Sequence, residues 1–255
     1  MLKHDFLTHT SIEGASSEGT RERKDVGGPT MRSRVSTDAS FSGQRPGILL
    51  FPDALGLGEH VKERADRLAK LGYVTLACDY YGDGTIFDSL DAAKKVLTAL
   101  REGTTRIRSR ARSALEAFSK HDEVDTTKLV ALGYCFGGTM ALELARSGAP
   151  LRGVCGFHSG LATKSPEDAR NIRGKVLVCI GADDPSITPE QRASFEKEMR
   201  EARVDWQLHL YGGVVHSFTD PNAARLGRPE FARYDADADD RSWQELVRFL
   251  EELFT

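Results

Sequence analysis

The sequence predicts one doubly wound α/β domain from residue 46 to the C-terminus. Short apolar segments alternate there with amphipathic segments at helical spacing, which is typical of parallel strands buried on both faces. The chain has 255 residues, and a chain of this size buries about 73% of its surface on folding. It can therefore build a large core without disulfides or metal ions.

The expected elements follow one another in regular order. Between Glu59 and Leu71, apolar residues recur at Val61, Ala65 and Leu68, and Gly72 ends the segment, which predicts a helix. The same criteria predict strands at Gly47–Phe51, Tyr73–Ala77, Leu129–Leu132, Val154–Phe157, Lys175–Ile180 and Trp206–Leu210. They predict further helices at Leu90–Arg101, Thr105–Lys120, Thr139–Arg146, Glu190–Arg203 and Asp239–Phe254.

Residues 1–45 differ from the rest of the chain. Seventeen of these 45 residues are Ser, Thr or Gly, so apolar periodicity is too short-lived to specify an element firmly. The segment is expected to be a poorly specified extension or an edge hairpin, with strands around His4–Ile12 and Met31–Val35.

Charge and composition exclude several classes of protein. The net charge is −3, without the basic excess of a nucleic-acid binder. The arginines of Arg106–Arg112 alternate with apolar residues and predict the solvated face of an amphipathic helix. The chain contains no apolar stretch long enough for a membrane span and no secretory signal pattern. We therefore expect a cytoplasmic protein without nucleic-acid or membrane partners. The sequence does not predict its oligomeric state.

The four cysteines form no disulfide framework and no zinc-binding pattern. Cys78, Cys155 and Cys179 lie in apolar, strand-like segments and are expected to be small buried hydrophobes. Cys135 differs because glycines surround it.

Cys135 lies in the segment Gly133-Tyr134-Cys135-Phe136-Gly137-Gly138, between a predicted strand and a predicted helix. This pattern matches the nucleophile elbow G-x-S-x-G with Cys in place of Ser. The elbow forces its central residue into a strained conformation, and side chains in place of the flanking glycines would collide with the neighbouring strand and helix. A cysteine at a helix N-terminus also favours the thiolate form. The alternative is a glycine-rich turn with an incidental buried cysteine.

Two later segments favour the catalytic interpretation. Asp183 and Asp184 follow the strand Lys175–Ile180, and His216 follows the strand Trp206–Leu210. Nucleophile, acid and histidine in this chain order are typical of α/β-hydrolases, and parallel strands collect their active site at their carboxyl ends. Taken separately, Asp184 could be a turn residue and His216 a histidine of a surface loop. These alternatives do not explain why both residues follow strands and occur in the chain order of a hydrolase triad.

The chain resembles the dienelactone hydrolase family of α/β-hydrolases from about Arg45 to Phe254. The resemblance rests on these segments: RPGILLFPDALGLGEHVKERADRLAKLGYVTLACDYYGDG, GYCFGGTMALELA, FHSGLAT, VLVCIGADDP, DWQLHLYGGVVHSF and YDADADDRSW. It implies that Cys135 is the nucleophile, that His216 is the general base and then the acid, and that Asp184 orients His216. Asp184 is preferred to Asp183 because it lies three residues after Gly181, as the family's acid does.

The resemblance also implies an oxyanion hole formed by the backbone N–H groups of Ala54 and Phe136. Asp53 occupies the place of a family glutamate that contacts the resting thiol. In that position it would keep Cys135 protonated until substrate binds, and so protect it from oxidation. The alternative is that Asp53, whose side chain is shorter, is a turn residue after Pro52.

One departure from the family concerns substrate charge. Asp220 stands four residues after His216, where known members carry a carboxylate-binding arginine. Arg225 or Arg228 could replace that cation, although both are expected to be solvated, and a second arginine is expected from residues 85–110. Small neutral esters are therefore expected to be hydrolysed at least as well as anionic lactones.

The predicted function is hydrolysis of a small carboxylic ester or lactone through a thioester acyl-enzyme, without a metal or organic cofactor. Two alternatives belong to other classes. One is a catalytically silent scaffold that binds a small ligand or a partner protein, and the other is a redox-sensing thiol at Cys135.

Overall fold

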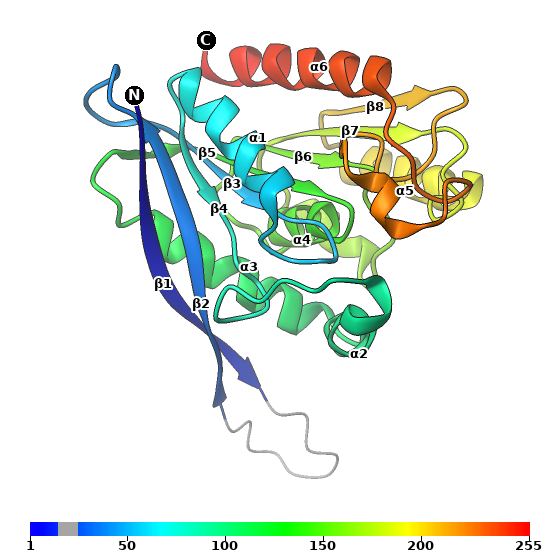
Figure 1. Ribbon diagram of the computed structural model, residues 1–255, viewed down its shortest axis with the longest axis horizontal. Helices are drawn as coiled ribbons and strands as arrows, with labels where there is room; N and C mark the ends of the chain where they lie inside the picture. Colours follow the sequence, from blue (N-terminus) through cyan, green and yellow to red (C-terminus); the bar gives the residue numbers. More distant parts are fainter. Residues whose placement is uncertain (15–24) are drawn as a thin grey trace.

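A mostly parallel sheet of eight strands organises the computed structural model, which describes residues 1–14 and 25–255 (Figure 1). The strand order is β1-β2-β4-β3-β5-β6-β7-β8. The six strands from β4 to β8 in this order run parallel, and β1 and β2 are antiparallel to their neighbours. The parallel strands are β3 (Arg45–Phe51), β4 (Val74–Ala77), β5 (Val124–Tyr134), β6 (Gly153–Phe157), β7 (Lys175–Gly181) and β8 (Trp206–Tyr211). The predicted single α/β domain is confirmed.

Helices cover both faces of this sheet (Figure 1). α1 (Glu59–Lys70) and α6 (Ala236–Phe254) pack on one face. The opposite face carries α2 (Leu90–Arg101), α3 (Thr104–Phe118), α4 (Phe136–Arg146) and α5 (Pro189–Ala202). Two short 3₁₀ helices, Pro166–Asn171 and Ala223–Leu226, lie in the connections.

Alternation along the strands divides the core into two layers. In β3, Ile48 and Leu50 join the layer beneath α1 and α6, whereas Leu49 and Phe51 join the layer on the other face. All four side chains are fully buried. A continuous apolar run is therefore what a strand covered on both faces requires.

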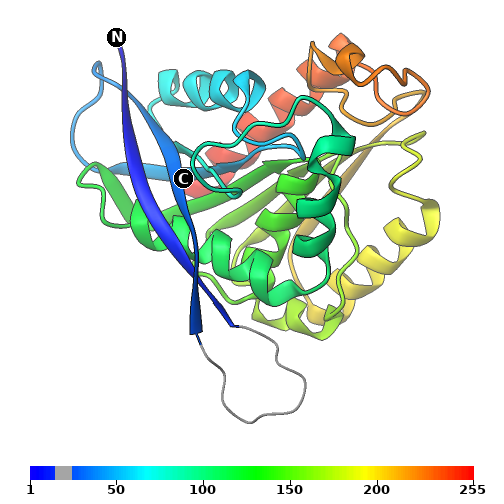
Figure 2. The ribbon, with the colours of Figure 1, turned by 60° about the horizontal axis from the view of Figure 1, so that its bottom comes forward.

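The N-terminal segment forms a long edge hairpin of β1 (Leu2–Gly14) and β2 (Asp25–Asp38). β2 extends the sheet by pairing with β4, and β1 lies across α3 (Figures 1 and 2). Both strands are longer than the sequence pattern indicates. Polar contacts explain the weak apolar signal: the buried His9 ring is hydrogen-bonded to Ser113 Oγ at 3.0 Å and to Ser33 Oγ at 2.9 Å.

The predicted solvated face of Arg106–Arg112 is wrong for two of its arginines. Arg110 is buried and pairs with Glu13 of β1 at 2.6 Å, and Arg108 pairs with Glu143 of α4 at 2.8 Å. The hairpin and α4 both pack on α3, so these charges have partners instead of water. No helix in the described residues has the length and apolar character needed to cross a membrane.

Candidate active site

Cys135 lies at a sharp turn between β5 and α4. Its backbone has φ 54° and ψ −120°, a strained conformation for a residue with a side chain. The turn also requires close backbone packing. A Cβ atom at Gly133 would lie 2.1 Å from the carbonyl oxygen of Gly137, and one at Gly137 would lie 2.2 Å from that of Phe51. α4 consequently begins at Phe136, earlier than the predicted Thr139.

The structure brings the three predicted residues together from three strand ends. His216 Nε2 lies 3.1 Å from Cys135 Sγ, and His216 Nδ1 lies 2.6 Å from Asp184 Oδ2. Asp184 follows β7, and His216 follows β8. Asp184 and His216 are buried, whereas Cys135 is partly accessible. The neighbouring Asp183 is exposed, in accordance with the choice of Asp184.

The surroundings of His216 stabilise its protonated form once Cys135 carries a negative charge. Burial by itself would lower the pKa of His216. The opposing effects are the charge of Cys135, the hydrogen bonds to Asp184 and Cys135, and the charge of Asp184, and together they raise the pKa to about 10. His216 can therefore accept the thiol proton of Cys135, and Asp184 stabilises the resulting imidazolium.

Ala54 and Phe136 both line the cavity that contains Cys135. The N–H of Phe136 lies in the first turn of α4, where no intrahelical acceptor is available. Within the described chain, neither the Ala54 N–H nor the Phe136 N–H donates to another protein group. Both are thus available to a substrate oxygen.

Asp53 also lines this cavity, and in the structure its carboxylate contacts two other groups. Its Oδ1 accepts a hydrogen bond from the Leu55 N–H at 2.8 Å, and its Oδ2 lies 3.4 Å from Arg225 Nη2. The short side chain closes a turn over its own loop, and the described residues show no hydrogen bond between Asp53 and Cys135. Burial, opposed by the Leu55 hydrogen bond and by Arg225, raises the pKa of Asp53.

Arg225 lines the cavity and is also exposed to solvent, as expected, with 40% of its side chain accessible. Its Nη2 is 3.0 Å from Asp220 Oδ2, and this ion pair offsets the acid at the position of the family arginine. Arg228 is largely exposed and lies near Glu230 at 3.7 Å, as expected for a solvated residue. In the expected region 85–110, Arg101 of α2 lines the cavity and lies over the Phe136 ring.

The cavity has a volume of about 740 Å³, and Asp53, Cys135 and Glu143 are among the residues that line it. α2, α3, α4 and the loops after β3, β6, β7 and β8 contribute to its walls. Leu97, Ile107 and Ile187 are among its apolar residues, and Lys94 and Lys164 are among its basic ones. This volume is in the usual range for small-molecule sites.

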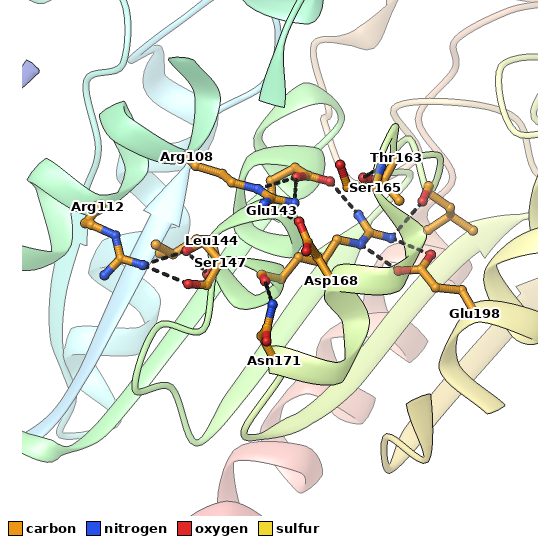
Figure 3. A network of polar contacts seen from close by, with 12 residues as sticks. Arg108, Arg112, Glu143, Leu144, Ser147, Thr163, Ser165, Asp168, Asn171 and Glu198 are labelled. Carbon is orange, nitrogen blue, oxygen red and sulfur yellow. Dashed lines mark hydrogen bonds and ion pairs between the residues drawn. The ribbon is translucent and has the colours of Figure 1, made fainter. Parts of the chain in front are cut away.

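Glu143, which also lines the cavity, belongs to an ion-pair network that anchors α4 (Figure 3). Arg146, fully buried, pairs with Glu143 at 3.0 Å and with Glu198 of α5 at 2.8 Å. It also donates to the Leu161 carbonyl at 3.0 Å. The network fixes the helix that carries Cys135 to α5 and to the loop after β6.

A second buried polar cluster lies behind His216 and was missed by the sequence analysis. His158 follows β6, and its ring lies edge-on to that of His216 with centroids 5.1 Å apart. The Thr219 hydroxyl connects His158 Nε2, at 2.9 Å, with His60 Nε2, at 3.3 Å. Burial, together with the charges of His216, His60 and Arg64, lowers the pKa of His158 well below its ordinary value, which keeps this ring neutral.

The other three cysteines are buried, as predicted. Burial raises the pKa of all three thiols. In residues 1–14 and 25–255, His, Cys, Asp and Glu side chains form no cluster of three that could hold a metal ion. Cys135 is therefore the accessible thiol of the described chain.

Comparisons with known proteins agree with this fold. The dienelactone hydrolase family is matched over residues 31–254, a range that includes most of β2. A crystal structure described as a dienelactone hydrolase-like promiscuous phosphotriesterase from metagenomic libraries is 38% identical. It superposes with a TM-score of 0.89 over 100% of this chain and 99% of that one.

Two curated relatives are more distant. A protein of Aquifex aeolicus named as a carboxymethylenebutenolidase is 26% identical, over 81% of this chain and 87% of that protein. A protein of Bradyrhizobium sp named as a 2-oxo-3-(5-oxofuran-2-ylidene)propanoate lactonase is 27% identical, over 69% of this chain and 75% of that protein.

The sheet order, the turn at Cys135 and the position of His216 define an α/β-hydrolase. The chain belongs to the dienelactone hydrolase family. It is a hydrolase of the class that acts on ester and lactone bonds.

Proposed function

We propose that the chain hydrolyses small carboxylic esters or lactones through Cys135, His216 and Asp184. The observation that carries the proposal is the continuous contact Asp184 Oδ2–His216 Nδ1–His216 Nε2–Cys135 Sγ at a strained strand–helix turn. Nucleophile, base and orienting acid are in the arrangement that covalent acyl transfer requires.

In the first step, His216 Nε2 takes the Cys135 proton while the sulfur attacks the substrate carbonyl carbon. A C–S bond forms, and the carbonyl electrons move onto oxygen. The Ala54 and Phe136 N–H groups stabilise this oxyanion, with a contribution of about 3 kcal/mol per donor. The ester C–O bond then breaks, and the leaving oxygen takes the proton from His216.

In the second step, His216 takes a proton from water as the water oxygen attacks the thioester. The C–S bond breaks, the carboxylic acid is released, and the proton returns from His216 to the sulfur. Every proton and electron pair is supplied by the chain, the substrate or water. Asp184 holds Nδ1 of His216 protonated throughout, so that Nε2 faces Cys135 as the acceptor.

The decisive experiment compares wild type with Cys135→Ala on a panel of esters and lactones. The proposal predicts a loss of at least about 10³-fold in kcat/KM, because the variant has no acceptor for the acyl group. Iodoacetamide should label Cys135 first, and mass spectrometry after rapid quenching should find the acyl group on the same peptide. A fully active Cys135→Ala variant would refute the proposal.

This experiment also tests the two alternative functions. A silent scaffold would hydrolyse nothing in either form. A redox-sensing thiol would be oxidised reversibly at Cys135 without ester turnover. The remaining cysteines Cys78, Cys155 and Cys179 are buried.

A second candidate activity is phosphotriester hydrolysis. It is favoured by the similarity to the metagenomic protein described as a promiscuous phosphotriesterase. The Cys135 thiolate would attack phosphorus, expel the most acidic alcohol and form a P–S bond, which water would then cleave to release the phosphodiester. Release of nitrophenolate from a p-nitrophenyl phosphotriester, lost in Cys135→Ala, would support it, and equal release by both forms would refute it.

A further inference from the structure

The peptide group between Asp53 and Ala54 carries the N–H that we propose as one oxyanion donor. A trans peptide is planar, and its C=O and N–H point to opposite sides. The described chain has no cis peptide bonds. The direction of the Asp53 carbonyl therefore determines the direction of the Ala54 N–H.

Two donors hold the Asp53 carbonyl. One is the Tyr80 hydroxyl, and the other is the Gly56 N–H at 3.2 Å. Tyr80 follows β4, a neighbour of β3 in the sheet, and only 1% of it is exposed. Burial, with the charges of Tyr81 and Asp53, raises the pKa of Tyr80 well above its ordinary value, so the hydroxyl keeps its proton and donates.

Tyr80 is itself firmly held and touches the residue that carries the second donor. Its ring packs edge-on against the Phe136 ring, with centroids 5.6 Å apart. Its main-chain carbonyl accepts a hydrogen bond from Arg110 Nη1 at 2.7 Å. Asp79 Oδ1 accepts from the Tyr81 N–H at 3.0 Å and fixes the next residue.

We propose that Tyr80 is a positioning residue for the oxyanion hole: its hydroxyl fixes the Asp53–Ala54 peptide so that the Ala54 N–H faces the substrate carbonyl oxygen. This role deepens the proposed function and rests on it. Tyr80 touches neither the substrate nor Cys135 in the proposed reaction, and acts only through the peptide group that it orients.

Tyr81 offers a matched control in the same loop. Its hydroxyl donates to the Ala54 carbonyl at 2.8 Å and therefore holds the next peptide group. The N–H of that peptide, on Leu55, already donates to Asp53 Oδ1 at 2.8 Å. Removing the Tyr81 hydroxyl thus disturbs the same loop without releasing the peptide that carries the proposed donor.

The experiment compares Tyr80→Phe with Tyr81→Phe, each of which removes one hydroxyl and keeps the ring. Steady-state hydrolysis of p-nitrophenyl acetate gives kcat and KM, and iodoacetamide gives the alkylation rate of Cys135. For Tyr80→Phe we expect kcat to fall on the order of 10-fold with KM unchanged. This is less than the roughly 10²–10³-fold loss of a whole donor, since Gly56 still holds the carbonyl. Tyr81→Phe should stay within about twofold of wild type.

Alkylation separates positioning from general damage to the site. Displacement of iodide by sulfur forms no oxyanion, so both variants should alkylate at the wild-type rate. An unchanged kcat in Tyr80→Phe, equal losses in both variants, or alkylation that falls together with kcat would each overturn the role of Tyr80. Retained activity in Cys135→Ala would instead refute the proposed function. An inactive Cys135→Ala beside a fully active Tyr80→Phe would refute only the inference about Tyr80.

Discussion

Asp184→Asn tests which tautomer of His216 the site requires. Asp184 is fully buried, and its two oxygens have separate partners: Oδ2 faces His216 Nδ1 at 2.6 Å, and Oδ1 accepts from the Ser186 N–H at 2.8 Å. An asparagine can keep the Ser186 bond and present its amide NH₂ to Nδ1. His216 would then carry its proton on Nε2 and could no longer accept the Cys135 proton.

The expected loss in kcat is on the order of 10⁴-fold, or about 5.4 kcal/mol of transition-state stabilisation. The same substitution should lower the pKa of His216, because the hydrogen bond and charge of Asp184 contribute to raising it to about 10. The assay is hydrolysis of p-nitrophenyl acetate at several pH values, with unfolding transitions to verify that the variant is folded.

Asp183→Asn is the matched control, because it removes the same charge from the neighbouring, exposed residue. Its kcat should remain within about threefold of wild type, since exposed charges interact weakly through water. A larger loss in Asp183→Asn than in Asp184→Asn would show that the wrong aspartate has been assigned to His216. Equal small losses would show that the orientation of His216 does not limit the reaction.

Three further predictions concern charge and stability. Asp220→Asn should raise kcat/KM for an anionic lactone relative to p-nitrophenyl acetate, and Arg225→Gln should lower it, because the two form an ion pair at 3.0 Å in the cavity; unchanged ratios in both variants would contradict this. Arg146→Met should reduce the free energy of unfolding in urea by about 3–5 kcal/mol, because the Glu198 carboxylate would stay buried without its cation, whereas a loss below about 1 kcal/mol would refute it. Burial lowers the pKa of His9 to about 4, so the neutral ring is fully favourable above pH 6.5 and unfolding takes up a proton below it. Wild type should therefore lose up to about 1.4 kcal/mol more per pH unit than His9→Gln between pH 6.5 and 4, and parallel pH profiles would exclude this.

Where apolar residues recur at strongly periodic spacing, the sequence by itself was sufficient to predict the strand or helix. The apolar run at Gly47–Phe51 and the spacing of Val61, Ala65 and Leu68 produced elements close to those observed. The glycines around Cys135 were equally informative, because only a turn without Cβ atoms permits the approach of Gly137 to Phe51. In these cases the deciding physics is local, so the pattern predicts the element.

The burial of polar residues in the edge hairpin and the pairing of the arginines of α3 depend on partners that are distant in the chain. His9 is buried because Ser113 and Ser33 satisfy its ring nitrogens, and no periodicity in β1 indicates this. Arg110 belongs to a segment that is typical of a solvated face, but Glu13 lies 97 positions away and pairs with it. A polar residue is equally compatible with water and with a buried partner until the partner's position is known.

At the active site, the sequence determined the residue types and the strand ends that carry them. Parallel strands place their carboxyl ends at one edge, so the order of Cys135, Asp184 and His216 was enough to predict that they meet. Only the tertiary structure decided which groups the neighbouring charged side chains contact. It placed the Asp53 carboxylate in contact with the Leu55 N–H and with Arg225, and it paired Asp220 with Arg225. These outcomes depend on side-chain reach and on competition among nearby donors over distances of a few ångströms, which strand order and residue spacing do not encode.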